Sequence, residues 1–512
     1  MELELKKESL DVYETGGELT LTQEETSETI VPDYCPDIAR IIETAGKVYI
    51  HSRELRDGKA EVSGTVRVTV LYTPDGESGI RTLEFAMPFT VESDNRSLPG
   101  CVYLTADTET ELLETRMLNP RKVFTHCKLV TRMTGYQKAP LCFCTDVAAD
   151  DSLCVEKRQE HQHTVLLRHI SEKDFTFTEE MNLSPGRDGA AELLKSQVCS
   201  SVTEAKIVGS KLIFKGLFSV SVLYRTMAGK CCSTTAELPF SQIMEIEGAA
   251  EGAVPSLQLQ LTGTDLQIDG DDPEGRQIAV TLYFHATALL REEQDITLLN
   301  DLYSTAYDMT YEAAPLMLTG FFETMTRRQT VREVLEIGVV AESILSIHVS
   351  CGAVSVNREG ENTMLRTGTT VRVLYLDEGG VPLVAERSID VGCQLELPAD
   401  CRVAACAVCA EEVQGSLGDR GIEVRFPVDF HIEAANRTKR VCISSGNLDL
   451  ESPKDTSGTP SLVLRCLGKQ ETTWDLAKKH NTTIASILSA NQLESENDIP
   501  REKLLLIPRK RA

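Results

Sequence analysis

Residues 61–72 read EVSGTVRVTVLY, and closely similar text recurs twice along the 512-residue chain. The second copy, IFKGLFSVSVLY, occupies residues 213–224, and the third, MLRTGTTVRVLY, occupies residues 364–375. Their closing tyrosines are 152 and 151 residues apart. A constant period of this length predicts three copies of one domain.

Apolar and polar residues alternate along each copy. In the first, Val68, Val70 and Tyr72 fall on one side of an extended chain, and Arg67 and Thr69 fall on the other. A two-residue period is typical of a strand with one buried face. Turn-forming residues separate such runs along the chain, as closely spaced strands require. We therefore predict a mainly β fold in which each repeat is a sandwich or an open barrel.

A glycine and a Pro-Phe pair accompany the strand motif. The glycine comes eight residues before the tyrosine in two copies and seven before it in the third, which we interpret as a one-residue slip. The Pro-Phe pair follows the tyrosine in the first two copies and is lost in the third. The positions are Gly64, Gly216 and Gly368 for the glycine, and Pro88-Phe89, Pro239-Phe240 and Asp390-Val391 for the pair.

One short helix per repeat is predicted from apolar spacing. PDIARIIETA at residues 36–45 and AAELLKSQV at residues 190–198 could each form two or three turns. In the third copy, VREVLEIGVV at residues 331–340 could be helix or strand.

The three copies resemble the SPOCS domain, also called the DUF3794 family. The resemblance rests on Pro36-Asp37-Ile38, on the Gly-x-x-x-Val-x-Val-Leu-Tyr strand and on the Pro-Phe pair. The predicted repeats span residues 1–155, 156–300 and 301–450.

A different module follows a polar linker at residues 451–460. Residues 461–512 predict the order strand, helix, helix, strand, with threonines as helix caps. The text Thr-x-Trp-Asp-Leu-Ala-Lys-Lys-His-Asn-Thr-Thr and the closing Lys-Leu-Leu-Leu-Ile-Pro resemble LysM, a small βααβ domain that binds peptidoglycan or chitin in many proteins.

The module departs from the glycan-binding LysM pattern. Gln470 stands where Gly-Asp-Thr usually begins, and Glu502 stands where the last loop usually has glycine. Longer side chains at these places should crowd a sugar, which favours a protein ligand. The predicted binding residues lie on the loops and the first helix, and are Gln470, Glu471, Thr472, Trp474, Lys478, Lys479 and Glu502. Trp474 is interpreted either as a partly exposed anchor for the partner or as a residue that packs over the module's own rim.

The net charge of −26 argues against nucleic acid or an anionic membrane as a partner. Residues 461–512 carry nine Lys or Arg and six Asp or Glu, a balance of +3, so the remainder carries −29. We see no apolar signal segment at the N-terminus and no membrane-spanning stretch, and we expect a cytoplasmic protein without membrane insertion.

No enzyme or cofactor motif is evident, so we expect a binding protein that needs no cofactor. Cysteine groups such as Cys401, Cys406 and Cys409 lack a clean second ligand pair for zinc, and free thiols are the simpler interpretation.

SPOCS repeats followed by LysM resemble the architecture of SipL-type proteins of spore-forming clostridia. The resemblance implies an adaptor at the forespore surface in the mother cell, whose LysM engages a coat-morphogenetic ATPase. The alternative is a protein of the cell wall or spore cortex that binds peptidoglycan through N-acetylglucosamine. An enzyme remains a third possibility.

Overall fold

The computed structural model describes residues 1–94, 96–184, 186–360, 362–410, 412–418, 421–455, 460–468, 471–499 and 504–509. Strands make up 77% of the described residues and helices 4%, which confirms the predicted mainly β fold class.

The strands before the C-terminal module fall into three groups with one plan. Repeat 1 contains β1 (Glu4–Ile30), β2 (Ile38–Arg56), β3 (Lys59–Pro74), β4 (Arg81–Glu92), β5 (Cys101–Asn119) and β6 (Lys122–Ala148). After a short 3-10 turn (Asp151–Leu153), repeat 2 contains β7 (Val155–Asn182), β8 (Ala190–Val208), β9 (Lys211–Thr226), β10 (Cys231–Glu245), β11 (Val254–Ile268) and β12 (Gln277–Ser304). Repeat 3 contains β13 (Tyr307–Leu335), β14 (Ala341–Glu359), β15 (Asn362–Asp377), β16 (Pro382–Glu396), β17 (Cys401–Ala410), β18 (Gln414–Gly418) and β19 (Gly421–Pro453).

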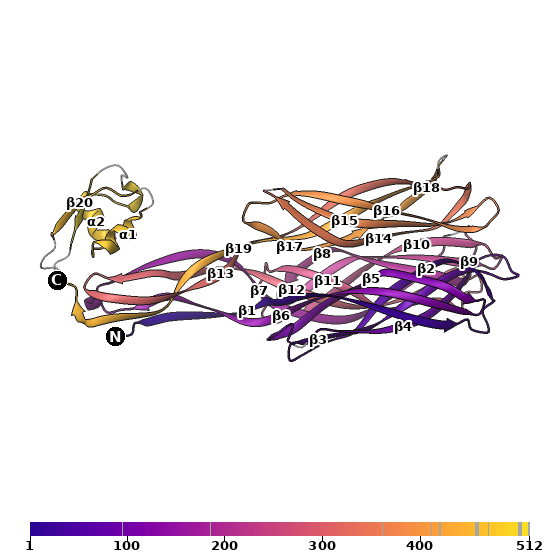
Figure 1. The fold of residues 1–512 in the computed structure, drawn as a ribbon, viewed down its shortest axis with the longest axis horizontal. Coiled ribbons are helices and arrows are strands. Elements are labelled where there is room, and N and C mark those ends of the chain that lie inside the picture. The colour runs from indigo at the N-terminus through magenta and orange to yellow at the C-terminus, as the bar shows by residue number, and fades with distance from the viewer. Residues whose placement is uncertain are drawn as a thin grey trace.

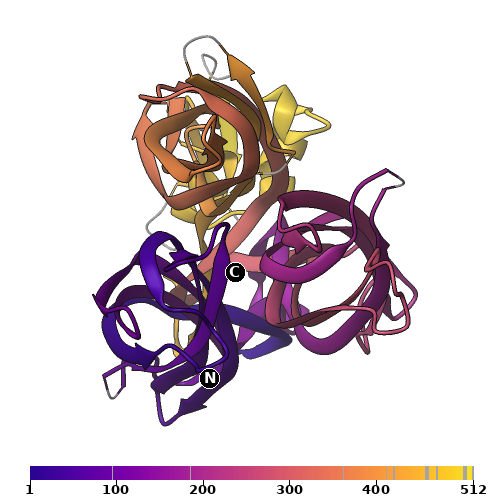
Figure 2. The ribbon, with the colours of Figure 1, turned by 90° about the vertical axis from the view of Figure 1, so that its right-hand side faces the viewer.

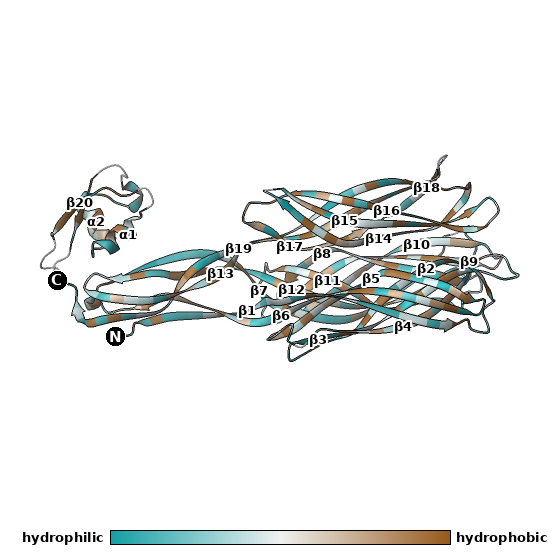
Figure 3. Cartoon of the chain, in the orientation of Figure 1, coloured by the Kyte–Doolittle hydropathy of each residue, from teal (hydrophilic) through white to brown (hydrophobic). Residues whose placement is uncertain are grey.

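Each repeat is built from two antiparallel sheets around one core. In repeat 1 the sheet orders are β2-β3-β4 and β1-β6-β5, and repeats 2 and 3 follow the same orders, with β18 added beside β19. In the end-on view of Figure 2, the three repeats surround a common axis, each curled into an open barrel. Brown and teal residues alternate along the strands in Figure 3, as the sequence predicted.

The Val-Leu-Tyr motif lies on β3, β9 and β15, the middle strand of its sheet in each repeat. Its tyrosine fills the core of its own repeat. Tyr72 and Tyr224 are fully buried, and their hydroxyls donate to the carbonyls of Pro36 at 3.1 Å and Asp188 at 3.3 Å. The motif therefore fixes the loop that enters the first strand of its sheet.

The glycine and the phenylalanine of the motif meet across the sheet. Gly64 pairs with Phe89, and Gly216 pairs with Phe240. A Cβ atom on these glycines would lie 2.7 Å from the Phe89 ring and 2.8 Å from the Phe240 ring. The backbone carbonyl of Tyr49 or Ser201 on the neighbouring strand would lie closer still, so the ring and this carbonyl together require glycine.

Repeat 3 lost both members of this pair together. The residue eight before Tyr375 is Thr367, and it pairs with Val391. Gly368 is the next residue on the strand and pairs with Asp390. The register of β15 with β16 has no irregularity, so the predicted one-residue slip of the glycine is wrong.

The segments predicted as helices are strands, and bulges explain the error. In β2, pairing with β3 shifts between Ile38 and Arg40 and again between Ile41 and Glu43. Paired shifts also begin β8 and β14. Each bulge adds an unpaired residue and shifts the alternation. Apolar residues that face a core then recur at spacings of three and four, such as Ile38 and Ile41 or Ala190 and Leu194, which imitates a helix. The affected predictions are residues 36–45 and 190–198. For residues 331–340, where helix and strand were both open, residues 331–335 end β13 and residues 336–340 connect it to β14.

The leucine of the Val-Leu-Tyr motif builds a core between repeats. Leu71, Leu223 and Leu374 are 1%, 3% and 1% exposed. They cluster with three residues from the neighbouring elements, Ile80, Leu194 and Leu345. Burying a leucine stabilises the fold by about 1.5–3 kcal/mol, so this axial cluster contributes substantially to the packing of the repeats against one another.

A buried ion pair joins repeats 1 and 2 beside this cluster. The Nζ atom of Lys195 lies 2.7 Å from Oε1 of Glu43, and the two side chains are 10% and 3% exposed. Nearby, burial lowers the pKa of Lys47 to about 8 and that of His348 to about 4. Ionisable side chains therefore lie inside the assembly of repeats, and the lowered pKa of His348 leaves its ring neutral at pH 7.

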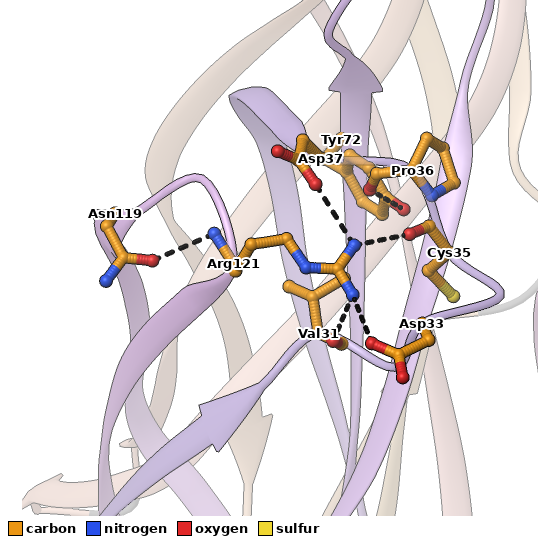
Figure 4. A network of polar contacts seen from close by, with 8 residues as sticks. All are labelled: Val31, Asp33, Cys35, Pro36, Asp37, Tyr72, Asn119 and Arg121. Atoms are coloured by element: carbon orange, nitrogen blue, oxygen red, sulfur yellow. Dashed lines mark hydrogen bonds and ion pairs between the residues drawn. The ribbon is translucent and has the colours of Figure 1, made fainter.

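Repeat 1 holds its Pro36-Asp37 loop through one arginine. Arg121 donates to the carbonyls of Cys35 at 2.7 Å and Val31 at 2.8 Å, and its guanidinium pairs with Asp33 and Asp37 (Figure 4). This network fixes the loop before β2, which carries the Pro-Asp-Ile part of the family motif.

The longest strands extend beyond the barrels in pairs and form a stalk (Figure 1). The stalk comprises residues 4–15 with 137–148, 155–167 with 292–304, and 307–318 with 438–453. Leucines, valines and cysteines of the three ribbons share one core. Leu3 donates its backbone N–H to Gly446, so the first ribbon also bonds to the third.

The fold predicts a strong effect of Gly216→Ala. We expect the free energy of unfolding to fall by about 1–3 kcal/mol or more, because the new methyl group meets both the Phe240 ring and the Ser201 carbonyl. The measurement is guanidinium unfolding followed by far-UV dichroism. Gly392→Ala is the control, since its Cβ would find atoms no closer than 3.6 Å. Equal effects of the two substitutions would contradict the Gly-Phe argument.

Candidate functional site

The C-terminal module has the predicted order of elements. It contains β20 (Leu462–Arg465), α1 (Thr473–Lys479), α2 (Ile484–Asn491), a 3-10 turn (Glu496–Asp498) and β21 (Leu505–Pro508), and β20 pairs with β21. Thr472 caps α1 through a reciprocal box with Asp475, and Thr483 caps α2. The threonine caps predicted from sequence are confirmed.

Helix α2 is fixed to the sheet of the module by Asn491. Its amide donates to the Leu506 carbonyl at 2.7 Å and accepts from the Leu506 N–H at 2.8 Å. Ile487 is fully buried beneath it. Helix α1 is therefore carried on a small, well-packed domain.

The face of α1 lies against the end of the stalk. Trp474 is only 5% exposed, and its indole Nε1 donates to Oδ2 of Asp301 at 2.7 Å. Its ring meets the ring of Tyr303 edge to face at 4.9 Å between centroids. The guanidinium of Arg158 lies 5.8 Å from the indole centroid. The interpretation of Trp474 as an exposed anchor is wrong for this arrangement, because repeat 2 covers it.

Asp301 is the centre of a charged network. The Lys478 ammonium lies 2.6 Å from Oδ1, and the Tyr311 hydroxyl donates to the same oxygen at 2.8 Å. Burial opposes the charge on Asp301, but hydrogen bonds from Lys478, Trp474 and Tyr311 outweigh it and lower the pKa of the carboxyl. Burial also opposes the charge of Lys478, and its bonds to Asp301 and Tyr311 raise its pKa. Each charge stabilises the other.

Further hydrogen bonds complete the contact. The buried Tyr303 hydroxyl donates to the Thr482 carbonyl at 2.7 Å. Lys454 donates to Asn481 at 2.8 Å and to the carbonyl of Ser304 at 2.8 Å. Residues 451–453 belong to β19 rather than to the predicted linker.

The structure divides the predicted site residues. Trp474 and Lys478 face the stalk, whereas Thr472 and Lys479 remain exposed. Glu471 is half-buried and pairs with Arg465 at 3.1 Å. Gln470 and Glu502 lie outside the described residues. The structure brings Trp474 and Lys478 together on one carboxylate, and the binding role of the set remains a prediction.

Sequence reasoning missed Asp301, Tyr303 and Tyr311. A signal existed for Asp301, because Asp146 holds the equivalent place in repeat 1. Both aspartates follow a bulge and accept the next N–H at 2.8 Å. Asp146 bonds Lys157 at 2.6 Å, as Asp301 bonds Lys478. The aspartate is thus a repeated lysine acceptor at the ribbon end.

Other candidate chemistry is weak in the described part of the chain. Cys409 lies 3.4 Å from His431, but the two side chains share the surface of one sheet and do not line the cavity of about 680 Å³ between repeats 1 and 3. Within the described ranges, no three His, Cys, Asp or Glu side chains group as metal ligands. Neither helix of the described residues is long and apolar enough to cross a membrane.

Comparison with known families gives a match over two segments of the chain. Residues 37–115 and 190–269 match the family described as SipL, SPOCS domain. These two segments are SPOCS domains of the SipL type. They comprise β2–β5 and β8–β11, the same four strands of repeats 1 and 2. The match relates the chain to sporulation. Repeat 3 has the same strand order but lies outside the match, and no curated protein matches the chain.

The charged network predicts release of the module in acid. The pKa of Asp301 is lowered in the docked state, so this contact stabilises docking above the undocked pKa and loses that contribution as pH falls through the docked pKa. Trp474, the sole tryptophan, should then shift its emission to the red while far-UV dichroism is still native.

Asp301→Asn tests the origin of this effect. In that variant the acid-dependent part of the emission shift should disappear, because the residue no longer titrates. An unchanged pH profile would assign the shift to other groups, such as His480, whose pKa is lowered by burial.

Proposed function

We propose that this chain is a non-enzymatic adaptor in endospore formation, which acts in the mother-cell cytoplasm and attaches coat-morphogenetic machinery at the forespore surface. The two SPOCS segments support the sporulation role. The attachment step is a protein contact of the C-terminal module, which resembles LysM. A coat-morphogenetic ATPase is the partner that the SipL-type resemblance implies.

The observation that favours a protein as the ligand of the module is the contact between α1 and the stalk. The α1 face binds a protein surface, namely the end of the stalk, through an indole, an ammonium and a backbone carbonyl. Trp474 and Lys478 find an aromatic ring and a carboxylate there, which are ordinary groups of a protein surface. Peptidoglycan is the competing ligand, and the replacement of the loop glycines by Gln470 and Glu502 argues against it.

A stalk that ends in the binding module suits an adaptor. The module and the tip of the stalk lie at one end of the molecule, and the barrels of the three repeats lie at the other (Figure 1). The surface of the barrels and the surface of the module are therefore separated along the long axis of the molecule. We propose that the barrels bind one structure and the module another.

We expect Trp474→Ala to weaken partner capture about 30-fold, since truncating a central aromatic anchor costs about 2 kcal/mol or more. The full chain serves as bait for lysate of sporulating cells, and captured proteins are quantified by mass spectrometry. Lys206→Ala, on an exposed cation of repeat 2, is the control.

Purified sacculi provide the second arm of this experiment. We expect the wild-type chain not to co-sediment with them. Tight co-sedimentation, or full capture of lysate protein by a Trp474→Ala chain with native dichroism, would replace the adaptor by the wall-binding alternative.

A further inference from the structure

The stalk occupies the same face of the module that the proposed partner needs. Trp474 is 5% exposed, and its indole N–H and the Lys478 ammonium both bond Asp301, at 2.7 and 2.6 Å. A second protein cannot reach the indole while Tyr303 lies against it. Binding to the stalk and binding to a partner through this face therefore exclude each other.

We propose that the stalk masks the partner-binding face of the C-terminal module, and that a partner binds only when the module leaves the stalk. This inference rests on the proposed function, because the masked face is the proposed partner site. The contact with Asp301 and Tyr303 is thus autoinhibitory.

The contact between the module and the stalk can open without unfolding the module. Asp301 receives both the indole N–H and the ammonium of the module, and the Tyr311 hydroxyl holds the same carboxylate from within the stalk, so one residue carries the charged part of the contact. Away from Tyr303, the core of the module consists of its own residues, including Leu476, Ile487 and Ile507. Release exposes the α1 face without opening the rest of that core.

The tether keeps a released module close to the stalk. Lys454 is fixed to Ser304 on the body, and only Asp455–Pro460 separate it from the module in sequence. A short tether gives a high effective concentration, so the module returns to the stalk unless a partner takes its place.

The contact of Trp474 and Lys478 with the stalk also indicates the chemistry of the partner. A competitor must replace a carboxylate that accepts from both Trp474 and Lys478, and an aromatic ring that packs against the indole. We infer an acidic protein surface with an exposed aromatic residue, which mimics Asp301 and Tyr303.

The first test of masking needs no partner. In the full chain carrying Asp301→Asn and Tyr303→Phe, acrylamide should quench Trp474 fluorescence severalfold more efficiently than in the wild type. Asp146→Asn is the matched control, because it alters the equivalent aspartate of repeat 1, whose partner is Lys157 instead of the module. Equal quenching of the double variant and the wild type would overturn the proposal.

The second test measures binding. The protein captured by the wild-type bait is purified, and its affinity is measured for wild-type, double-variant and Asp146→Asn chains. Masking predicts at least fivefold tighter binding to the double variant, with the Asp146→Asn chain equal to the wild type.

The outcomes separate the two proposals. Equal affinity of wild type and double variant refutes masking and leaves the adaptor function standing. If even the unmasked chain captures no protein, the adaptor function fails, and masking of its partner site fails with it.

Discussion

The body of this protein depends on one strand that serves two cores. The valines and the tyrosine of the Val-Leu-Tyr strand fill the interior of their own repeat, while the leucine between them points to the shared axis. The axial leucines come from three different repeats, so none can be buried until the others are in place. The relative positions of the barrels therefore depend on one apolar residue on the outward face of each of these strands, together with the shared core of the stalk.

Much of the fold was predictable from the alternation of apolar and polar residues, the constant spacing of the strand motif and the threonines that cap the helices. Val68, Val70 and Tyr72 indicated a half-buried strand, and the constant spacing of the motif indicated three copies. What alternation could not reveal was where it is interrupted. The bulges at the start of β2 and β8 moved Ile41 and Leu193 to helical spacing, and only the pairing partners on β3 and β9 show that the chain is extended.

The site was predictable in its local chemistry and not in its surroundings. Thr472 and Asp475 are three residues apart, and a capping box is visible in sequence. Trp474 and Asp301 are 173 residues apart, and the sequence around either residue gives no sign that the two are in contact. An isolated module would leave the indole on its surface, and the burial of that indole comes from the stalk. Aligning the repeats would have drawn attention to Asp301 through Asp146, but not to what it binds.

Fusing three repeats into one chain breaks a symmetry that separate subunits would keep. A trimer of identical chains would present three identical ribbon ends, each with its own module. Here, Asp146 is occupied by Lys157 from the neighbouring strand, and Asp301 receives Lys478. The stoichiometry is thus one module to three repeats. On any surface that such bodies cover, the spacing between attachment points would be set by the width of the whole bundle rather than by that of one barrel.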